Sequence, residues 1–358
     1  MIFNYEPYIT KEEVNSFQEC VRTGIANPSH IKNAQDRLAK TYGINCLLTS
    51  SGTAAIHIAL LSLNIGPGDE VICPDLTFAA TWNAIKYVGA EPVFIDSDPE
   101  TWCIDYSKIE SKINKKTKAI ITVDLFGNPC NYDKIKNMSR KYGLHLIQDA
   151  AESLGSTYKG ASVFHQGDIS CTSFNLNKIV TSCGGGAIFS AESKTIRECE
   201  TLCNQNKKGP GYDYFNVGYN YRMGSINAAL LMSQIARIEK ILEAKKKIKS
   251  TYHNLLSDQD ITYQRVDCNS VSNEWIVVAK LSDKATRDKI HRNLIENSIE
   301  SKLIFKPASS VDWIRSQYKL SPMNISSKIF DTSLILPSST QISEKQIERV
   351  CKIIKRSL

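Results

Sequence analysis

The sequence predicts an α/β protein with a large domain, built on a doubly wound and mostly parallel seven-stranded sheet, and a smaller C-terminal α+β domain. Short apolar runs alternate with segments of helical periodicity between residues 46 and 189, as is typical of βαβ units. A polar, glycine-containing break and a long helical stretch follow. With 358 residues and 42% hydrophobic content, the chain can bury one large core and a companion core.

The alternation assigns each element of the predicted fold in order. The predicted strands of the sheet are 46–50, 71–73, 92–96, 119–123, 145–149, 170–174 and 187–189. Helices among them are predicted at 53–63, 79–88 and 132–142. After a polar segment at 204–215 come a long helix at 225–253, a strand at 275–281, a helix at 285–297 and a final helix from Ser343. We expect residues 1–245 to form the large domain and 246–358 the small one.

The composition indicates an intracellular protein that does not enter the membrane. No run approaches the ~18 apolar residues of a membrane span, and the first residues lack the basic and apolar regions of a signal peptide. The eleven cysteines are dispersed, without a Cys-x-x-Cys pair or neighbouring histidines, so neither a metal site nor a disulfide framework is indicated. We therefore expect a cytoplasmic protein.

The net charge of +7 does not by itself indicate a nucleic-acid partner, because basic residues are scattered among acidic ones. The densest basic run, Lys245-Lys246-Lys247-Ile248-Lys249, lies late in the predicted long helix and is most simply a solvated face. We expect no nucleic acid as partner. A positive field could still attract a nucleotide-linked substrate.

An acid, a hydroxyl and a lysine follow one another where predicted strands end, at Asp149, Ser173 and Lys178. Pyridoxal phosphate (PLP) chemistry requires these three groups: an acid that keeps the pyridine nitrogen protonated, a hydroxyl that holds the phosphate, and a lysine that forms a Schiff base with the cofactor. Taken singly, the acid is also common as a helix cap and the lysine as a solvated surface residue. Ligands collect at the carboxyl ends of strands in open α/β sheets, where all three residues are predicted.

A further candidate element lies upstream, at the turn between the first predicted strand and its helix. Gly52 allows the backbone to approach a ligand closely, and the helix that opens at Thr53 offers unpaired N–H groups to a phosphate. This turn therefore supplies a second candidate phosphate contact for the same cofactor.

Together with these elements, an ordered set of short motifs resembles the DegT/DnrJ/EryC1/StrS family of PLP-dependent sugar aminotransferases, which have the fold-type-I architecture of aspartate aminotransferase. The matching segments are Thr49-Ser50-Ser51-Gly52-Thr53-Ala54-Ala55, Gly66-Pro67-Gly68-Asp69-Glu70-Val71, Leu76-Thr77-Phe78, Glu91-Pro92-Val93-Phe94-Ile95-Asp96, Asp149-Ala150-Ala151-Glu152, the Lys178 segment and Gly218-Tyr219-Asn220-Tyr221-Arg222. They occur in family order from near residue 46 to near residue 222, so the resemblance is specific for the family and less so for the substrate.

The resemblance implies roles for further residues. Gly52 and Thr53 would bind the cofactor phosphate together with Ser173. Phe78 would stack on the pyridine ring, and Glu152 would contact the phenolic oxygen of the cofactor. Each of three residues also has an ordinary alternative. Phe78 could be a core residue at a helix start, Ser173 a strand hydroxyl bonded to backbone, and Glu152 a charge at a helix terminus.

Asn220 and Arg222 have implied roles beyond their own subunit's cofactor. The matching asparagine of the family reaches the cofactor phosphate of the other subunit, which implies a homodimer with shared active sites. The alternative is a turn asparagine between two packed tyrosines. Arg222 would pair with a phosphate or carboxylate of the substrate, and its alternative is a structural salt bridge.

By the same resemblance, the reaction would transfer the amino group of L-glutamate to a nucleotide-linked keto sugar for surface polysaccharide, lipopolysaccharide or glycan biosynthesis. Asn177 before the lysine and the run Gly184-Gly185-Gly186 resemble the branch that aminates C4 of 4-keto-6-deoxysugars more than the C3 branch. A C3-aminating enzyme remains the alternative. One departure concerns Lys306-Pro307-Ala308-Ser309, where relatives often have Lys-Pro-Met-His. The missing histidine bears on how the sugar nucleotide is recognised.

Three other classes are less favoured. PLP-dependent sugar 3-dehydratases of the family replace the lysine by histidine, whereas this chain has Lys178. A non-catalytic scaffold would more readily have lost Lys178 or Asp149. An oxidoreductase of the Rossmann type would carry a Gly-x-Gly-x-x-Gly turn after the first strand, which this sequence lacks.

Overall fold

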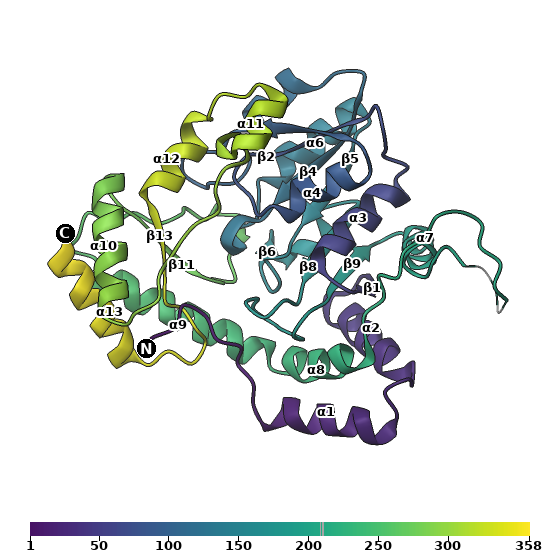
Figure 1. Cartoon of the computed structure of the whole chain (residues 1–358), viewed down its shortest axis with the longest axis horizontal. Helices are drawn as coiled ribbons and strands as arrows, with labels where there is room; N and C mark the ends of the chain where they lie inside the picture. The colour runs from purple at the N-terminus through teal and green to yellow at the C-terminus, as the bar shows by residue number, and fades with distance from the viewer. Residues whose placement is uncertain (208, 210) are drawn as a thin grey trace.

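A seven-stranded sheet with helices on both faces organises the larger part of the chain (Figure 1). The computed structural model describes residues 1–207, 209 and 211–358. Across the sheet, the strands follow the order β1 (Asn45–Thr49), β9 (Gly186–Ser190), β8 (Ile169–Ser173), β5 (His145–Asp149), β4 (Thr117–Val123), β2 (Glu70–Pro74) and β3 (Glu91–Ile95). β9 is antiparallel to both neighbours, and the other neighbouring pairs are parallel. The predicted α/β fold class with a mostly parallel seven-stranded sheet is therefore confirmed.

Alternate residues of each strand enter two different hydrophobic cores, because successive side chains of a strand point to opposite faces. In β1, Leu47 belongs to one core while Cys46 and Leu48 belong to the other. The Leu47 core lies under α3 (Gly52–Ser62), α4 (Ala80–Tyr87) and α7 (Ser193–Cys203). The opposite core lies under α2 (Ser29–Tyr42), α6 (Tyr132–Tyr142) and α8 (Ser225–Ala236). Helix layers on both faces leave the strand ends as the open edge of the sheet.

A third core belongs to the C-terminal part of the chain. It lies between the sheet of β11 (Val277–Lys280), β13 (Ser333–Leu336) and β12 (Lys302–Leu303) and the helices α9 (Ile238–Leu255), α10 (Lys284–Glu296) and α13 (Glu344–Ser357). Ile2 joins this core and forms a β-bridge with Ile299. The division at residues 245 and 246 falls inside α9 and stays a prediction.

The remaining described elements connect these layers. They are α1 (Lys11–Thr23), α5 (Tyr106–Ile109), α11 (Asp312–Tyr318), α12 (Asn324–Thr332), the small sheet of β10 (Ser270–Val271), β6 (Thr157–Tyr158) and β7 (Ala161–Ser162), and 3₁₀ turns at Glu110–Lys112, Leu125–Gly127, Val163–His165 and Ala308–Ser310. None of the helices in the described ranges has the length and apolar character needed to cross a membrane.

The prediction of a single long helix over 225–253 is wrong, because the helix breaks at Arg237, where φ is −113° and ψ is 10°. The Arg237 guanidinium pairs with the buried Glu13 carboxylate of α1 and stacks on the Tyr8 ring, 4.7 Å from its centroid. The break lets α8 pack against α1 and α2 while α9 runs to α13. Neither proline nor glycine marks the position, so hydrophobic periodicity alone could not reveal it.

Candidate active site

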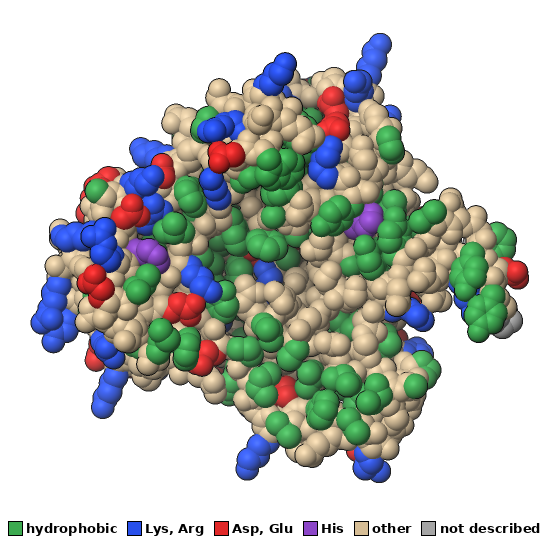
Figure 2. Space-filling view, viewed as in Figure 1, with side chains coloured by type: hydrophobic (Ala, Val, Ile, Leu, Met, Phe, Trp, Pro, Cys, Tyr) green, Lys and Arg blue, Asp and Glu red, His purple; other side chains and the backbone are tan. Residues whose placement is uncertain are grey.

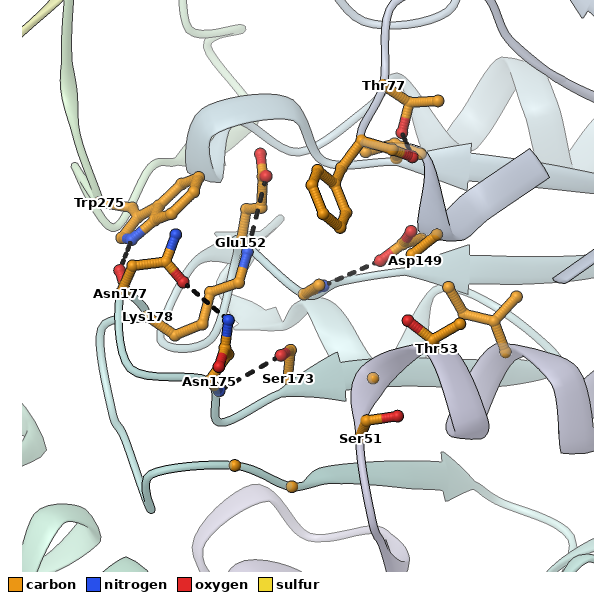
Figure 3. A pocket seen from close by; sticks show the side chains of 18 of the residues that line it. Ser51, Thr53, Thr77, Asp149, Glu152, Ser173, Asn175, Asn177, Lys178 and Trp275 are labelled. Atoms are coloured by element: carbon orange, nitrogen blue, oxygen red, sulfur yellow. Dashed lines mark hydrogen bonds and ion pairs between the residues drawn. The ribbon is translucent and has the colours of Figure 1, made fainter. Parts of the chain in front are cut away.

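A cavity of about 300 Å³ opens at the carboxyl ends of β1, β4, β5 and β8. Except for Asn220 and Arg222, all the site residues proposed from the sequence line it: Gly52, Thr53, Phe78, Asp149, Glu152, Ser173 and Lys178. Figure 3 shows the polar side chains converging from the sheet, the α3 turn and the loop after β8. The structure thus brings acid, amine and hydroxyl groups together in one cavity, and none of the described residues that line it is a cysteine or a histidine.

The start of α3 is packed directly against the end of β8. Ser51 caps the helix by accepting a hydrogen bond from the Ala54 N–H at 3.0 Å. A Cβ atom on Gly52 would lie only 2.8 Å from the Ser173 Cβ. Gly186 is equally confined, since its Cβ would lie 2.6 Å from the Gly52 nitrogen. These glycines therefore bring the helix N-terminus and the Ser173 hydroxyl together in one corner of the cavity, where the unpaired N–H groups of the helix can bind a phosphate.

Asp149 ends β5 and is buried, 5% exposed. Its carboxylate accepts hydrogen bonds from the Thr81 hydroxyl at 2.8 Å and the Ala151 N–H at 3.2 Å. Burial raises the pKa of Asp149, while these bonds and the Lys178 charge act in the opposite direction. The Thr81 hydroxyl in turn meets that of Thr77 at 2.8 Å. Sequence reasoning missed both threonines, although Thr77 lies in the Leu76-Thr77-Phe78 motif.

Lys178 lies in the loop between β8 and β9, and its side chain is 12% exposed. Its Nζ lies 3.7 Å from Oε1 of Glu152, while Oε2 accepts the Phe126 N–H at 2.7 Å. Burial raises the pKa of Glu152 to about 7, although the Lys178 charge and the Phe126 N–H oppose this effect. The amine and the carboxyl group therefore form an ion pair at the wall of the cavity.

Aromatic rings wall the cavity. Phe78 is 57% exposed, and its ring centroid lies 5.5 Å from that of Phe305, which lies 5.7 Å from that of Phe126. Trp275 closes the side next to Lys178, with the Lys178 Nζ 4.2 Å from its ring centroid (Figure 3). Neither Phe305 nor Trp275 was singled out from the sequence, because both reach the cavity from the C-terminal part.

Asn220 and Arg222 do not line the cavity of their own chain. Both are exposed, and the Arg222 Nη2 donates to Oδ1 of Asn220 at 3.5 Å. Their backbone is fixed by isolated β-bridges from Asn220 to Asn204 and from Arg222 to Thr49. Their roles in a partner's cofactor and in substrate binding therefore stay predictions.

Ser309, which stands where relatives often have histidine, is fully buried and bonded to Asp75 at the end of β2. Asp75 accepts from the Ser309 N–H at 2.6 Å and from its hydroxyl at 2.8 Å. The serine hydroxyl also accepts the Met323 N–H at 3.1 Å. This residue holds the loop against the large sheet and offers no free group to a substrate.

The donor set fits PLP. The α3 N-terminus, Thr53 and Ser173 offer phosphate donors, Asp149 offers a buried acceptor for a pyridinium nitrogen, and Lys178 offers the amine. The aromatic walls suit a flat conjugated ring. Over the described residues, no group of three or more histidine, cysteine, aspartate or glutamate residues could hold a metal ion.

Comparisons with known proteins agree with this chemistry. The profile of the "DegT/DnrJ/EryC1/StrS aminotransferase family" matches residues 7–355. The chain is 33% identical to the GDP-perosamine synthase of Escherichia coli O157:H7, covering 98% of this chain and 96% of that protein. It is also 33% identical to the UDP-2-acetamido-2-deoxy-3-oxo-D-glucuronate aminotransferase of Pseudomonas aeruginosa, covering 68% of each. Among solved structures, the PLP form of Spr1654 of Streptococcus pneumoniae, a candidate sugar aminotransferase, superposes with a TM-score of 0.92 at 26% identity, covering 99% of this chain and 98% of that one.

Proposed function

Because the chain belongs to the DegT/DnrJ/EryC1/StrS aminotransferase family, we propose that it moves the amino group of L-glutamate to C4 of a nucleotide-linked 4-keto-6-deoxysugar. The enzyme is a PLP-dependent aminotransferase of fold type I. The observation that carries the proposal is the convergence of Lys178, Glu152 and Asp149 in one cavity beside the α3 N-terminus.

The chain's own residues have distinct tasks in this reaction. When bound, PLP supplies an electron-withdrawing ring that stabilises negative charge on a substrate carbon. Asp149 would hold the pyridine nitrogen in its protonated form, and the Lys178 amine would carry a proton to and from the substrate. Gly52, Thr53 and Ser173 would hold the phosphate. Glu152 would contact the phenolic oxygen, and Phe78 would stack on the ring.

Several observations support the substrate class. One relative is named for GDP-perosamine, a nucleotide-linked amino sugar. Asn177 and the Gly184-Gly185-Gly186 run favour C4, and the net charge of +7 suits a diphosphate-bearing substrate. The relative named for a 3-oxo sugar supports the alternative, amination at C3. A nucleotide amino sugar would feed a surface polysaccharide, lipopolysaccharide O-antigen or other glycan.

We expect glutamate-dependent amination of a UDP-, dTDP- or GDP-linked 4-keto-6-deoxyhexose, with an amine at C4 of the product. Donor and acceptor would use the same cavity in turn, so double-reciprocal plots should give the parallel lines of ping-pong kinetics. NMR of the purified product would locate the new amine. An amine at C3 would contradict the C4 assignment, and 2-oxoglutarate release independent of any keto sugar would contradict the acceptor class.

We also propose that the active unit is a homodimer in which Asn220 reaches the partner's cofactor phosphate. The segment that leads from α7 to α8 protrudes from the rest of the molecule (Figure 1), and hydrophobic side chains gather on the protruding part (Figure 2). Its Tyr212, Tyr214 and Val217 are 83%, 56% and 71% exposed. Apolar side chains on a protruding segment are typical of an interface between copies. In this proposal, a second copy of the chain covers these exposed side chains.

Mixing inactive Lys178→Ala chains with impaired Asn220→Ala chains should restore activity. A hybrid dimer of this kind contains one site with an intact Lys178 and an intact partner Asn220, so up to about one quarter of all sites in a random mixture would be whole. Subunit exchange would be confirmed with differently tagged chains, and activity measured afterwards. Exchange without recovered activity would show that Asn220 acts within its own subunit or not at all.

The cysteines support a cytoplasmic enzyme in this proposal. All eleven are free, and nine of them are buried, with Cys183 and Cys268 exposed. A protein with this many unpaired thiols suits a reducing compartment, where nucleotide sugars would also be available.

A further inference from the structure

We propose that Trp275 is a positioning residue for the Lys178 amine, holding it against Glu152 from the side of the C-terminal part. The inference rests on the proposed function, because it concerns the lysine that carries the reaction. Trp275 lies two residues before the start of β11. It lines the cavity and is buried, with 3% of its surface exposed.

The first support is the position of the Lys178 Nζ between two groups. It lies 4.2 Å from the Trp275 ring centroid and 3.7 Å from the Glu152 carboxylate (Figure 3). An ammonium over the face of a tryptophan is attracted to its π electrons, and the attraction grows when water is excluded. With the Lys178 side chain 12% exposed, the amine is confined by a ring face and a carboxylate.

The second support is that the indole has little freedom to move. Its Nε1 donates to the Asn177 carbonyl at 2.6 Å, so the ring is tied to the residue just before Lys178. Its backbone carbonyl accepts a hydrogen bond at 3.0 Å from Lys245, which also donates to the Ser338 carbonyl at 2.5 Å. Lys245 is buried, so the solvated face predicted for its basic run is wrong at this residue, whose amine is held by these two carbonyls. A tryptophan that is bonded through both its ring nitrogen and its backbone carbonyl can fix the direction of a long, flexible lysine side chain.

The third support links Trp275 to the other wall of the amine site. The Trp275 N–H donates to Oδ1 of Asn273 at 3.0 Å, and the Asn273 Nδ2 donates to the Glu152 carbonyl at 2.8 Å. Gly127 leaves room for this asparagine, since a Cβ at residue 127 would lie 2.0 Å from Oδ1. One buried amide therefore links the backbones of Glu152 and Trp275, the two residues whose side chains face the Lys178 amine.

The consequence is a fixed location for the amine whenever Lys178 is released by the amino donor. A lysine that is released once and returns once in each transamination cycle benefits from a defined location, because a displacement of 1 Å can cost roughly 100-fold in rate. Trp275 would act through Lys178 and would not itself touch the reacting atoms.

The test compares Trp275→Leu, which removes the ring and the donor, with Trp275→Phe, which keeps a ring face. Trp313→Leu is the control, because Trp313 is 49% exposed, packs on Trp82 and does not line the cavity. Each enzyme would be loaded with pyridoxamine phosphate, treated briefly with acetic anhydride, and digested for mass mapping of Lys178. Steady-state kcat and the KM for glutamate would be measured on the same preparations.

For Trp275→Leu we expect Lys178 to be acetylated roughly tenfold faster, as loss of a shielded cation–π contact implies, and kcat to fall roughly 100-fold with little change in KM. Trp275→Phe should restore kcat to within about tenfold of the original enzyme, and Trp313→Leu should change neither value. If Trp275→Leu does not fold, Trp275→Met fills the site without a π face and carries the same expectations.

Unchanged acetylation and kcat in the leucine or methionine variant would overturn the inference. So would a phenylalanine variant as impaired as the leucine one, since the ring face would then not hold the amine. Failure of the proposed function is separable, because it would appear as an amine at C3 or as 2-oxoglutarate release independent of a keto sugar, whereas the acetylation of Lys178 does not depend on the acceptor.

Discussion

Replacing Lys178 with alanine should lower turnover by roughly 10³-fold or more, because a single amine serves as the covalent anchor and as the carrier of the proton. The substitution removes a partly buried ammonium and leaves the phosphate corner around Gly52 and Ser173 unchanged. The variant should therefore still bind PLP without a covalent bond. Single-turnover and steady-state assays would measure the loss, and ultracentrifugation with absorbance detection would measure the bound cofactor.

Borohydride reduction of the unaltered enzyme, followed by peptide mass mapping, should place the cofactor on Lys178. Lys245 is the informative competitor, because it lines an adjacent small cavity together with Lys178, and burial lowers its pKa to about 7. Its Nζ donates to two backbone carbonyls, and Lys245 does not line the main cavity. Label on Lys245 or on any other lysine would contradict the assignment.

Replacing Asp149 with asparagine should retain PLP but reduce turnover by several orders of magnitude. A neutral amide cannot stabilise a positive pyridine nitrogen, and the ring then accepts electrons poorly. The side chain keeps its size, so the Thr81 contact at 2.8 Å can be kept through the amide oxygen. Turnover would be measured beside the absorbance spectrum and the cofactor content of the purified variant.

Asp75→Asn is the matched control for this substitution. Asp75 is also a buried acid at the end of a strand of the same sheet, yet it bonds to Ser309 and does not line the cavity. We expect Asp75→Asn to lower the free energy of unfolding and to leave the absorbance spectrum of the bound cofactor largely unchanged. Nearly normal turnover of Asp149→Asn at full PLP content would refute the role assigned to Asp149.

The sequence was sufficient for the sheet and for the nearest polar groups because their signals are local. Asp149, Ser173 and Lys178 lie within one short stretch, where the first two lie at the ends of predicted strands and Lys178 follows in the next loop. Gly52 likewise indicates the turn between the first predicted strand and its helix. These residues could be proposed together because parallel strands present their carboxyl ends at one edge.

The residues that sequence reasoning missed depend on tertiary packing. Trp275 meets Lys178 only because α9 carries the chain from the large sheet to β11, and no periodicity encodes that approach. Thr81 looked like an ordinary residue of an early helix until β5 placed Asp149 against it. The break at Arg237 follows from its pairing with Glu13, a residue far away in sequence.

The position of β9 between β1 and β8 has a consequence for how the enzyme is made. Asn45 pairs with Ser190 and Thr49 with Gly186. The first strand of the sheet therefore cannot form its backbone hydrogen bonds until β9, which is synthesised much later, is available. Pairings between distant segments form slowly, and their edges stay exposed during synthesis on the ribosome. The phosphate corner, which needs Gly52 beside Ser173 and Gly186, cannot exist before this closure. Cofactor capture should therefore follow sheet closure, and a shortage of PLP during expression should leave a complete fold that can still be loaded afterwards.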